Sequence, residues 1–103
     1  MRKIQLALAE SALTDLEDIK RWYAGQAVPE VGNRLIREIL QRIEGLRDYP
    51  DLGRMVPEFG QDFLRELIHP PFRIVFRRET DRVRIVRIWR CERQLELDNP
   101  PVD

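Results

Sequence analysis

Residues 63–90 read FLRELIHPPFRIVFRRETDRVRIVRIWR and determine how the rest of the chain must be arranged. They contain three strand-like runs, at 63–68, 72–78 and 82–90, and in the second run Phe72, Ile74 and Phe76 alternate with residues expected on the opposite face. Two prolines separate the first run from the second, and Thr80-Asp81 separates the second from the third. Because both links are short, the sequence predicts a three-stranded antiparallel meander.

The chain upstream of this meander begins with a further predicted strand. Ile4, Leu6 and Leu8 alternate with polar or small residues over 3–10, as in a half-buried strand. Helical spacing then runs from Ser11 to about Gly25, and Ser11 is a side chain that can cap such a helix. The sequence therefore predicts a strand followed directly by a helix.

A second amphipathic helix is predicted after Pro29, which suits the first turn of a helix because it lacks an N–H. Its apolar stripe continues until Tyr49-Pro50. The short link between the helices predicts an antiparallel helical hairpin. Residues 51–62 contain two glycines and a proline without a sustained period, and they are predicted to be a loop.

The predicted order of strand, helix, helix and three strands indicates a two-layer α+β fold. The helical hairpin must bury its apolar stripe, and one face of the sheet is the available partner. The other face is then expected to be uncovered and to carry arginines of the last two strands. At 103 residues the chain suits one domain, predicted over 1–95, with a frayed acidic tail at 96–103.

The net charge is zero, but the charge is unevenly distributed along the chain. Residues 63–93 carry nine arginines and four acidic side chains, whereas residues 1–62 are slightly acidic. A basic segment of this kind can focus a positive field on one surface. The alternative is that these charges merely alternate with apolar residues on a solvated strand face.

The chain has one histidine, His69, one cysteine, Cys91, and one serine, so the usual catalytic constellations cannot be assembled. We expect His69 to be structural and Cys91 to be a plain, semi-buried thiol. No catalytic residue, cofactor or metal is expected. A lone cysteine and a charged N-terminus without an apolar leader favour a cytoplasmic location.

The remaining candidate site is rich in arginine, a residue that binds carboxylates and phosphates through a planar fork. Its predicted members, which would contact an anionic or protein target, are Arg54, Arg73, Arg90 and Arg93. For Arg73 a purely structural role is equally open, in which it pairs across strands with Glu66 or Glu92. Trp22, Trp89 and Phe72 are expected to pack in the core.

Three segments together resemble the RelE/ParE family of bacterial type II toxins. They are SALTDLEDIKRWYA, YPDLGRMVPEFG and RELIHPPFRIVFRRETDRVRIVRIWRCERQL. The family pattern corresponds to residues 50–54, 65–76 and 83–89 and to Arg93, and the resemblance spans about residues 3–95. It implies a sheet with two helices on one side. It also implies an antitoxin that neutralises the toxin by wrapping around it.

Toxins of this family act either on DNA gyrase or, as ribosome-dependent endonucleases, on mRNA. The nuclease branch keeps an arginine at the position of Arg73, with Arg54 as a looser match. However, its later arginine and tyrosine positions fall near Cys91 and Leu97 here. The resemblance therefore favours the ParE-like, gyrase-inhibiting branch without chemistry of its own. The alternatives are an mRNA endonuclease and an inactive relative that only binds antitoxin.

The antitoxin is expected to cover the helical hairpin and part of the sheet, because such partners use exposed apolar surface. Within the hairpin, the predicted contact residues lie on or beside the apolar stripes. They are Leu16, Ile19, Trp22, Leu35, Ile36 and Leu40.

Overall fold

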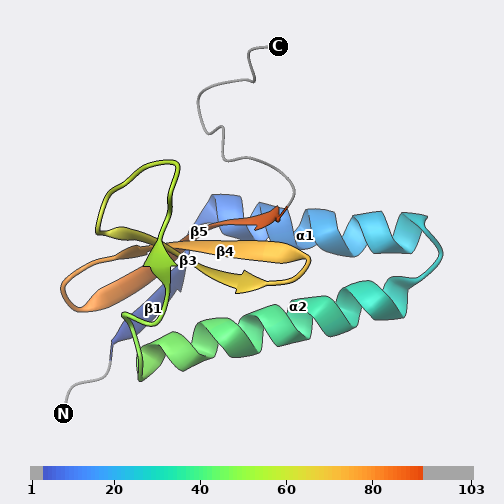
Figure 1. Cartoon of the computed structure of the whole chain (residues 1–103). Coiled ribbons are helices and arrows are strands. Elements are labelled where there is room, and N and C mark those ends of the chain that lie inside the picture. Colours follow the sequence, from blue (N-terminus) through green and yellow to red (C-terminus); the bar gives the residue numbers. More distant parts are fainter. Residues whose placement is uncertain (1–3, 92–103) are drawn as a thin grey trace.

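The computed structural model describes residues 4–91 as an α+β fold with the predicted order of elements (Figure 1). Strand β1 (Gln5–Leu8) leads into helices α1 (Glu10–Gly25) and α2 (Pro29–Glu44), the latter followed by the 3₁₀ turn η1 (Gly45–Arg47). The remaining strands are β2 (Arg54–Met55), β3 (Leu64–His69), β4 (Phe72–Arg78) and β5 (Arg82–Arg90). No helix among these described residues has the length and apolar character needed to cross a bilayer.

The predicted meander is confirmed and forms the centre of a five-stranded sheet with the order β1-β5-β4-β3-β2. Strands β3, β4 and β5 are antiparallel, while β1 lies parallel to β5 with Gln5 opposite Arg82. The prediction that 51–62 is entirely loop is wrong, because β2 pairs Arg54 with Glu66 at the far edge. A two-residue strand is too short to produce an alternating pattern in the sequence.

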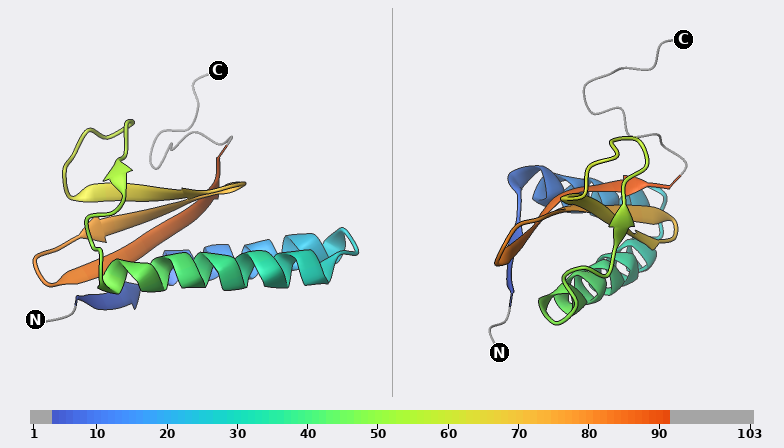
Figure 2. Two further views of the ribbon diagram at one scale, coloured as in Figure 1. Left: turned by 60° about the horizontal axis from the view of Figure 1, so that its bottom comes forward. Right: turned by 60° about the vertical axis from the view of Figure 1, so that its left-hand side comes forward.

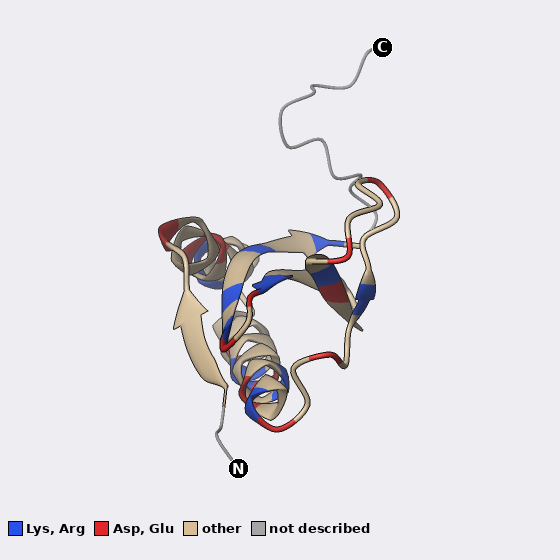
Figure 3. Cartoon of the chain, turned by 90° about the vertical axis from the view of Figure 1, so that its left-hand side faces the viewer, with Lys and Arg blue, Asp and Glu red and all other residues tan. Residues whose placement is uncertain are grey.

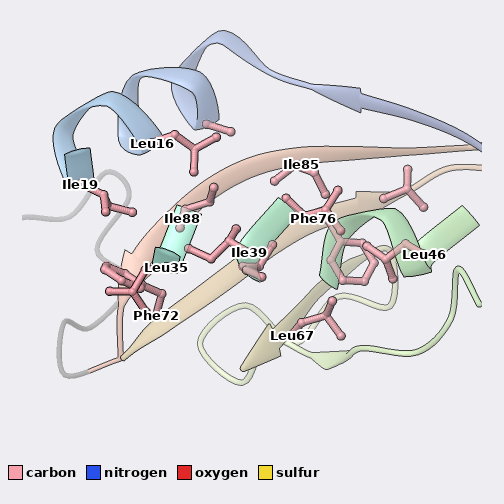
Figure 4. Close-up of a cluster of buried hydrophobic side chains, with 14 residues drawn as sticks. Leu16, Ile19, Leu35, Ile39, Leu46, Leu67, Phe72, Phe76, Ile85 and Ile88 are labelled. Carbon is pink, nitrogen blue, oxygen red and sulfur yellow. The ribbon is translucent and has the colours of Figure 1, made fainter. Parts of the chain in front are cut away.

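Both helices pack on the same side of the sheet, here called its helix face (Figure 2). One apolar cluster, drawn in Figure 4, fills the space between the two helices and the sheet. Ile39 of α2 and Ile74 and Phe76 of β4 are fully buried at its centre. The helical hairpin therefore buries its stripe on the sheet as predicted, which is the largest apolar burial in the described chain.

The opposite side of the sheet, here called its loop face, is partly covered, which corrects the expectation of an uncovered face. Val56 from the segment after β2 packs with Val75 of β4 and Trp89 of β5 in a second, smaller buried cluster. Phe59 of the same segment packs against it. The periodicity of the strands could not reveal this cover, because the covering segment has no period of its own.

Helix α1 also covers the edge of β5 where β1 ends. The prediction that Ser11 caps the helix is wrong, since α1 begins at Glu10 after an extended Ala9. The Ser11 hydroxyl instead donates to the Val86 carbonyl at 2.6 Å, and the Ile88 N–H donates to the Asp15 carboxylate at 2.8 Å. Two side chains one helical turn apart thus satisfy strand groups that have no neighbouring strand.

Candidate functional site

Four charged side chains form a continuous arginine–glutamate cluster on the loop face. Its members are Arg54 of β2, Glu66 of β3, Arg73 of β4 and Glu58 of the segment that covers the face. In Figure 3, basic and acidic positions are interspersed along the strands and loops. The cluster therefore has no net charge, although its two arginines were predicted to form a positive surface.

Every charged group in the cluster is hydrogen-bonded to a group of opposite charge. Arg73 Nε donates to Glu66 Oε1 at 2.8 Å, and its Nη1 and Nη2 each donate to one oxygen of Glu58 at 3.0 Å. Arg54 Nε donates to Glu66 Oε2 at 2.7 Å. Glu58 therefore takes the fork of Arg73 with both oxygens, which is the strongest geometry for a guanidinium and a carboxylate.

Burial makes these bonds obligatory. The Glu66 side chain is completely buried and that of Arg73 is 8% exposed, so either charge would be costly without its partner. The hydrogen bond to Glu58 is the main cause that raises the pKa of the Arg73 guanidinium above its ordinary value. Burial opposes this rise, and the hydrogen bond to Glu66 adds to it. Arg73 thus stays cationic, and of the two partners considered for its structural role, Glu66 is hydrogen-bonded to it. Glu92 lies outside the described residues.

A close backbone approach brings Arg54 to this cluster. A Cβ at Gly53 would lie 2.6 Å from the backbone oxygen of Glu66, so only glycine allows β2 to approach β3 in this way. The Arg65 guanidinium donates to the Gly53 carbonyl at 3.0 Å and holds the same segment. Arg54 is then placed with its Nε on Glu66 and with its side chain 61% exposed.

A surface pocket of about 530 Å³ opens beside the cluster. It is lined by Arg54, Pro57, Glu58, Ile68, Arg73 and Cys91. The Cys91 thiol is exposed, so the expectation of a semi-buried thiol is wrong. Among the described residues, no three His, Cys, Asp or Glu side chains gather as metal ligands would. The pocket thus offers cationic, anionic and apolar groups for binding.

The structure does not bring Arg90 to this cluster. Arg90 ends β5 and places its guanidinium over the Trp22 ring at 4.7 Å and over the Phe72 ring at 5.4 Å. These residues line a separate pocket of about 400 Å³ between α1 and the end of β5. Arg93, the fourth predicted member, lies outside the described residues.

The residues predicted to meet an antitoxin divide into three groups by their exposure. Leu16, Ile19 and Leu35 are largely buried in the core between the hairpin and the sheet, which leaves little of their surface for a partner, although Ile19 also lines the pocket of about 400 Å³. Trp22 is 50% exposed and Leu40 is 42% exposed.

Ile36, the sixth predicted contact residue, is partly buried against the core. The exposure of Trp22 also contradicts its predicted core packing, which is confirmed for Phe72 and Trp89.

Two carboxylates with specific roles were missed by sequence reasoning. Glu58 lies in an aperiodic segment, where no pattern distinguishes it from a solvated glutamate. Asp15 was assigned no specific partner from the sequence, but it accepts two bonds from Arg87, at 2.9 and 3.1 Å. Its position on the buried stripe of α1 was the available signal, since a carboxylate there needs a partner.

His69 has the structural role that was predicted for it. Its Nε2 lies 3.0 Å from Glu38 Oε1, and its Nδ1 lies 3.5 Å from Arg42 Nη1, so the ring connects the end of β3 with α2. The hydrogen bond from His69 lowers the pKa of the Glu38 carboxyl, helped by Arg34. The same Arg42 guanidinium donates to the Ile68 carbonyl at 3.3 Å.

A family comparison places the chain in a defined class of bacterial toxin. The model of the family described as the ParE toxin of type II toxin-antitoxin systems, parDE, matches residues 6–95. The chain belongs to this family, as its motifs predicted.

A solved structure described as the chromosomal ParDE TA system from P. aeruginosa is similar, with a TM-score of 0.73 and 25% sequence identity. The match covers 86% of this chain and 97% of that one. No curated protein sequence matches significantly.

Proposed function

We propose that this chain is a toxin that inhibits DNA gyrase, acts in the cytoplasm and arrests growth unless an antitoxin neutralises it. Gyrase inhibition is the activity that the resemblance to the ParE branch implies. The single structural observation that supports this branch over the nuclease branch is the state of Arg73. Its guanidinium is buried and held by Glu58 and Glu66.

An endonuclease would need Arg73 to meet the phosphate that is being cleaved. A guanidinium already bound by two carboxylates has its charge offset, and the arginines cannot move a proton because they stay protonated. The two glutamates of the cluster, which could act as acids or bases, are themselves held by these arginines. His69 is occupied by Glu38 and Arg42 rather than placed at the pocket. Binding without chemistry is therefore the simpler use of this surface.

The antitoxin of this toxin is proposed to cover the exposed apolar residues of the hairpin. Trp22 and Leu40 remain available there, and Leu13 is similarly exposed. Such residues are anchors for a helix or strand of a partner. Hydrogen exchange on the toxin–antitoxin complex should show added protection within residues 12–46, and its absence would contradict this proposal.

The proposed activity is tested by supercoiling of relaxed plasmid with purified gyrase while the free toxin is titrated in. Loss of supercoiling or accumulation of cleaved plasmid is expected. R54A should weaken inhibition, because Arg54 is exposed beside the pocket, whereas R21A, on the exposed side of α1, should not.

Unchanged supercoiling by a folded toxin would contradict gyrase inhibition. New 5′ ends within mRNA from expressing cells would then identify the nuclease alternative. Normal growth of cells that express the toxin without antitoxin would identify an inactive relative.

A further inference from the structure

We infer that three arginines at one end of the loop face bind phosphate groups of a DNA backbone. They lie where β4 turns into β5, are called here the hairpin arginines, and are Arg77, Arg82 and Arg84. Figure 3 faces this end of the molecule. Phosphate binding does not depend on the proposed target. The choice of DNA over RNA rests on the proposed function, because gyrase acts on DNA.

The sheet places the hairpin arginines side by side. Alternation along β4 puts Arg77 on the loop face with Val75, and Arg77 lies directly opposite Arg84 in the antiparallel register. Arg82 precedes Arg84 by two residues and so lies on the same face, about 7 Å away along the strand. None of the three lines the pocket beside the arginine–glutamate cluster, so they form a separate surface.

One carboxylate serves these guanidinium groups. Glu79 Oε1 accepts from Arg82 Nε at 3.0 Å, and Glu79 Oε2 lies 3.6 Å from Arg77 Nε. The hydrogen bond from Arg82 is the main cause that lowers the pKa of the Glu79 carboxyl. Burial opposes this shift, and the charges of all three hairpin arginines add to it. Three positive charges therefore share one negative charge.

The other charges of the hairpin do not cancel this excess. Arg78 pairs with Asp51 at 2.9 Å, and Asp81 of the turn is exposed. Counted over residues 77–84 together with Asp51, four arginines (77, 78, 82 and 84) face three carboxylates (51, 79 and 81). One positive charge thus remains at this end of the sheet.

Arg84 is the least compensated of the hairpin arginines. Its Nε is buried, and no described residue provides a hydrogen-bond acceptor for it. Arg84 also lies opposite Arg77, and like charges directly opposite one another destabilise a sheet. An anion bound between the two guanidinium groups would offset this repulsion.

An open row of arginines suits a nucleic-acid backbone better than a single acidic side chain. The side chains of Arg77 and Arg82 are 54% and 42% exposed. A backbone presents one charged phosphate after another, and guanidinium forks fit phosphate oxygens. Arg77 also lies over the exposed Phe63 ring at 4.9 Å, a contact that steadies the guanidinium plane without using its N–H donors.

The first test measures binding of the purified full-length toxin to a short labelled DNA duplex by fluorescence anisotropy, between about 50 and 200 mM salt. The double variant R77Q/R84Q should bind severalfold more weakly at the lowest salt. Its slope of log K against log salt should fall by about 1 for each arginine removed. R21Q is the matched control, because Arg21 is 72% exposed on α1, and it should change neither quantity.

A second variant should strengthen binding. E79Q removes the carboxylate that the hairpin arginines share, so DNA affinity should rise severalfold. E30Q changes the net charge of the chain equally, but Glu30 is exposed where α1 turns into α2, at the other end of the molecule (Figure 1). E30Q should therefore leave the affinity close to that of the unaltered toxin.

The outcomes each decide the inference. Equal affinities and salt slopes for R77Q/R84Q and R21Q would overturn it, as would equal gains for E79Q and E30Q. A single-stranded RNA bound as tightly as the duplex would overturn the assignment to DNA. Weaker antitoxin binding by R77Q/R84Q with unchanged DNA binding would mean that this surface meets a protein instead. If the double variant does not fold, R77Q alone should lower the slope by about 1, and an unchanged slope would be equally contradictory.

The same variants separate this inference from the proposed target. If no form inhibits gyrase while R77Q/R84Q still loses affinity for the duplex, the proposed target fails and the inference stands. If the unaltered toxin inhibits gyrase and R77Q/R84Q matches it both in inhibition and in DNA affinity, the inference fails and the target stands.

Discussion

The two faces of the sheet are both buried near the centre of β4, but by different means. On the helix face, Ile74 and Phe76 lie against two amphipathic helices in a continuous apolar cluster. On the loop face, Val75 belongs to a cluster of only three buried residues, and the neighbouring Arg73 is held by carboxylates. The helix face therefore supplies most of the stability, whereas the loop face combines a small apolar cluster with charges that are bonded to one another.

The largest expected effect lies on the helix face. Phe76→Ala removes a fully buried ring and should lower the free energy of unfolding by about 3–5 kcal/mol, measured by urea denaturation. Phe63→Ala is the control, because this ring is 42% exposed and its described contact is with the Arg77 guanidinium at 4.9 Å. It should lose about 1 kcal/mol or less. Similar losses would contradict the dominant contribution of the buried helix-face cluster.

The next effect concerns the ionic part of the loop face. Glu66→Gln removes a buried charge that two arginines share, and should destabilise the fold by about 3 kcal/mol. The control is Glu44→Gln, which breaks an exposed pair with Arg47 and should change stability by less than about 1 kcal/mol. A neutral effect of E66Q would mean that the cluster is dispensable for folding.

A smaller effect is expected where α1 meets the edge of the sheet. Asp15→Asn weakens bonds to Arg87 and to the Ile88 N–H, and should lower stability by about 2 kcal/mol. Faster hydrogen exchange of the Ile88 amide would locate the loss. Asp18→Asn changes an exposed carboxylate on the same helix and should leave that amide unaffected. Equal exchange in both variants would contradict the edge role of Asp15.

The smallest effect is a dependence on acidity. Because hydrogen bonding to His69 lowers the pKa of Glu38 in the folded state, the ionised carboxylate stabilises the fold above its ordinary pKa. This contribution is lost as the pH falls through the lowered folded value. Glu38→Gln should therefore flatten the low-pH side of a stability profile, recorded by thermal denaturation from pH 3 to pH 6. An unchanged profile would contradict the link.

The strands and helices were predictable because their apolar periods are long enough to read. The run 72–78 matches β4 and 82–90 matches β5. What the alternation of β4 did not reveal is that Phe72 through Phe76 are all buried, including the intervening Arg73 and Val75. Burial of the second face depends on residues 56–59, and contacts between an aperiodic segment and a strand leave no periodic signal.

The candidate site was predictable only in part for a similar reason. The arginines were visible as residue types, and Glu66 was a foreseeable partner of Arg73 because the two strands pair. Glu58 was not foreseeable, since its position depends on how the segment after β2 folds back. Arg90 was grouped with the others by sequence alone, but it points to aromatic rings near α1.

The parallel pairing of β1 with β5 has a consequence for synthesis. Gln5 leaves the ribosome well before its partner Arg82, and Ser11 finds its acceptor 75 residues later. Contacts this distant close slowly and only after the intervening chain exists. The nascent helical hairpin therefore has no sheet on which to bury Leu35 and Ile39 until β4 and β5 have emerged. The toxin fold therefore needs β5, and a chain that stops before β5 cannot complete the sheet.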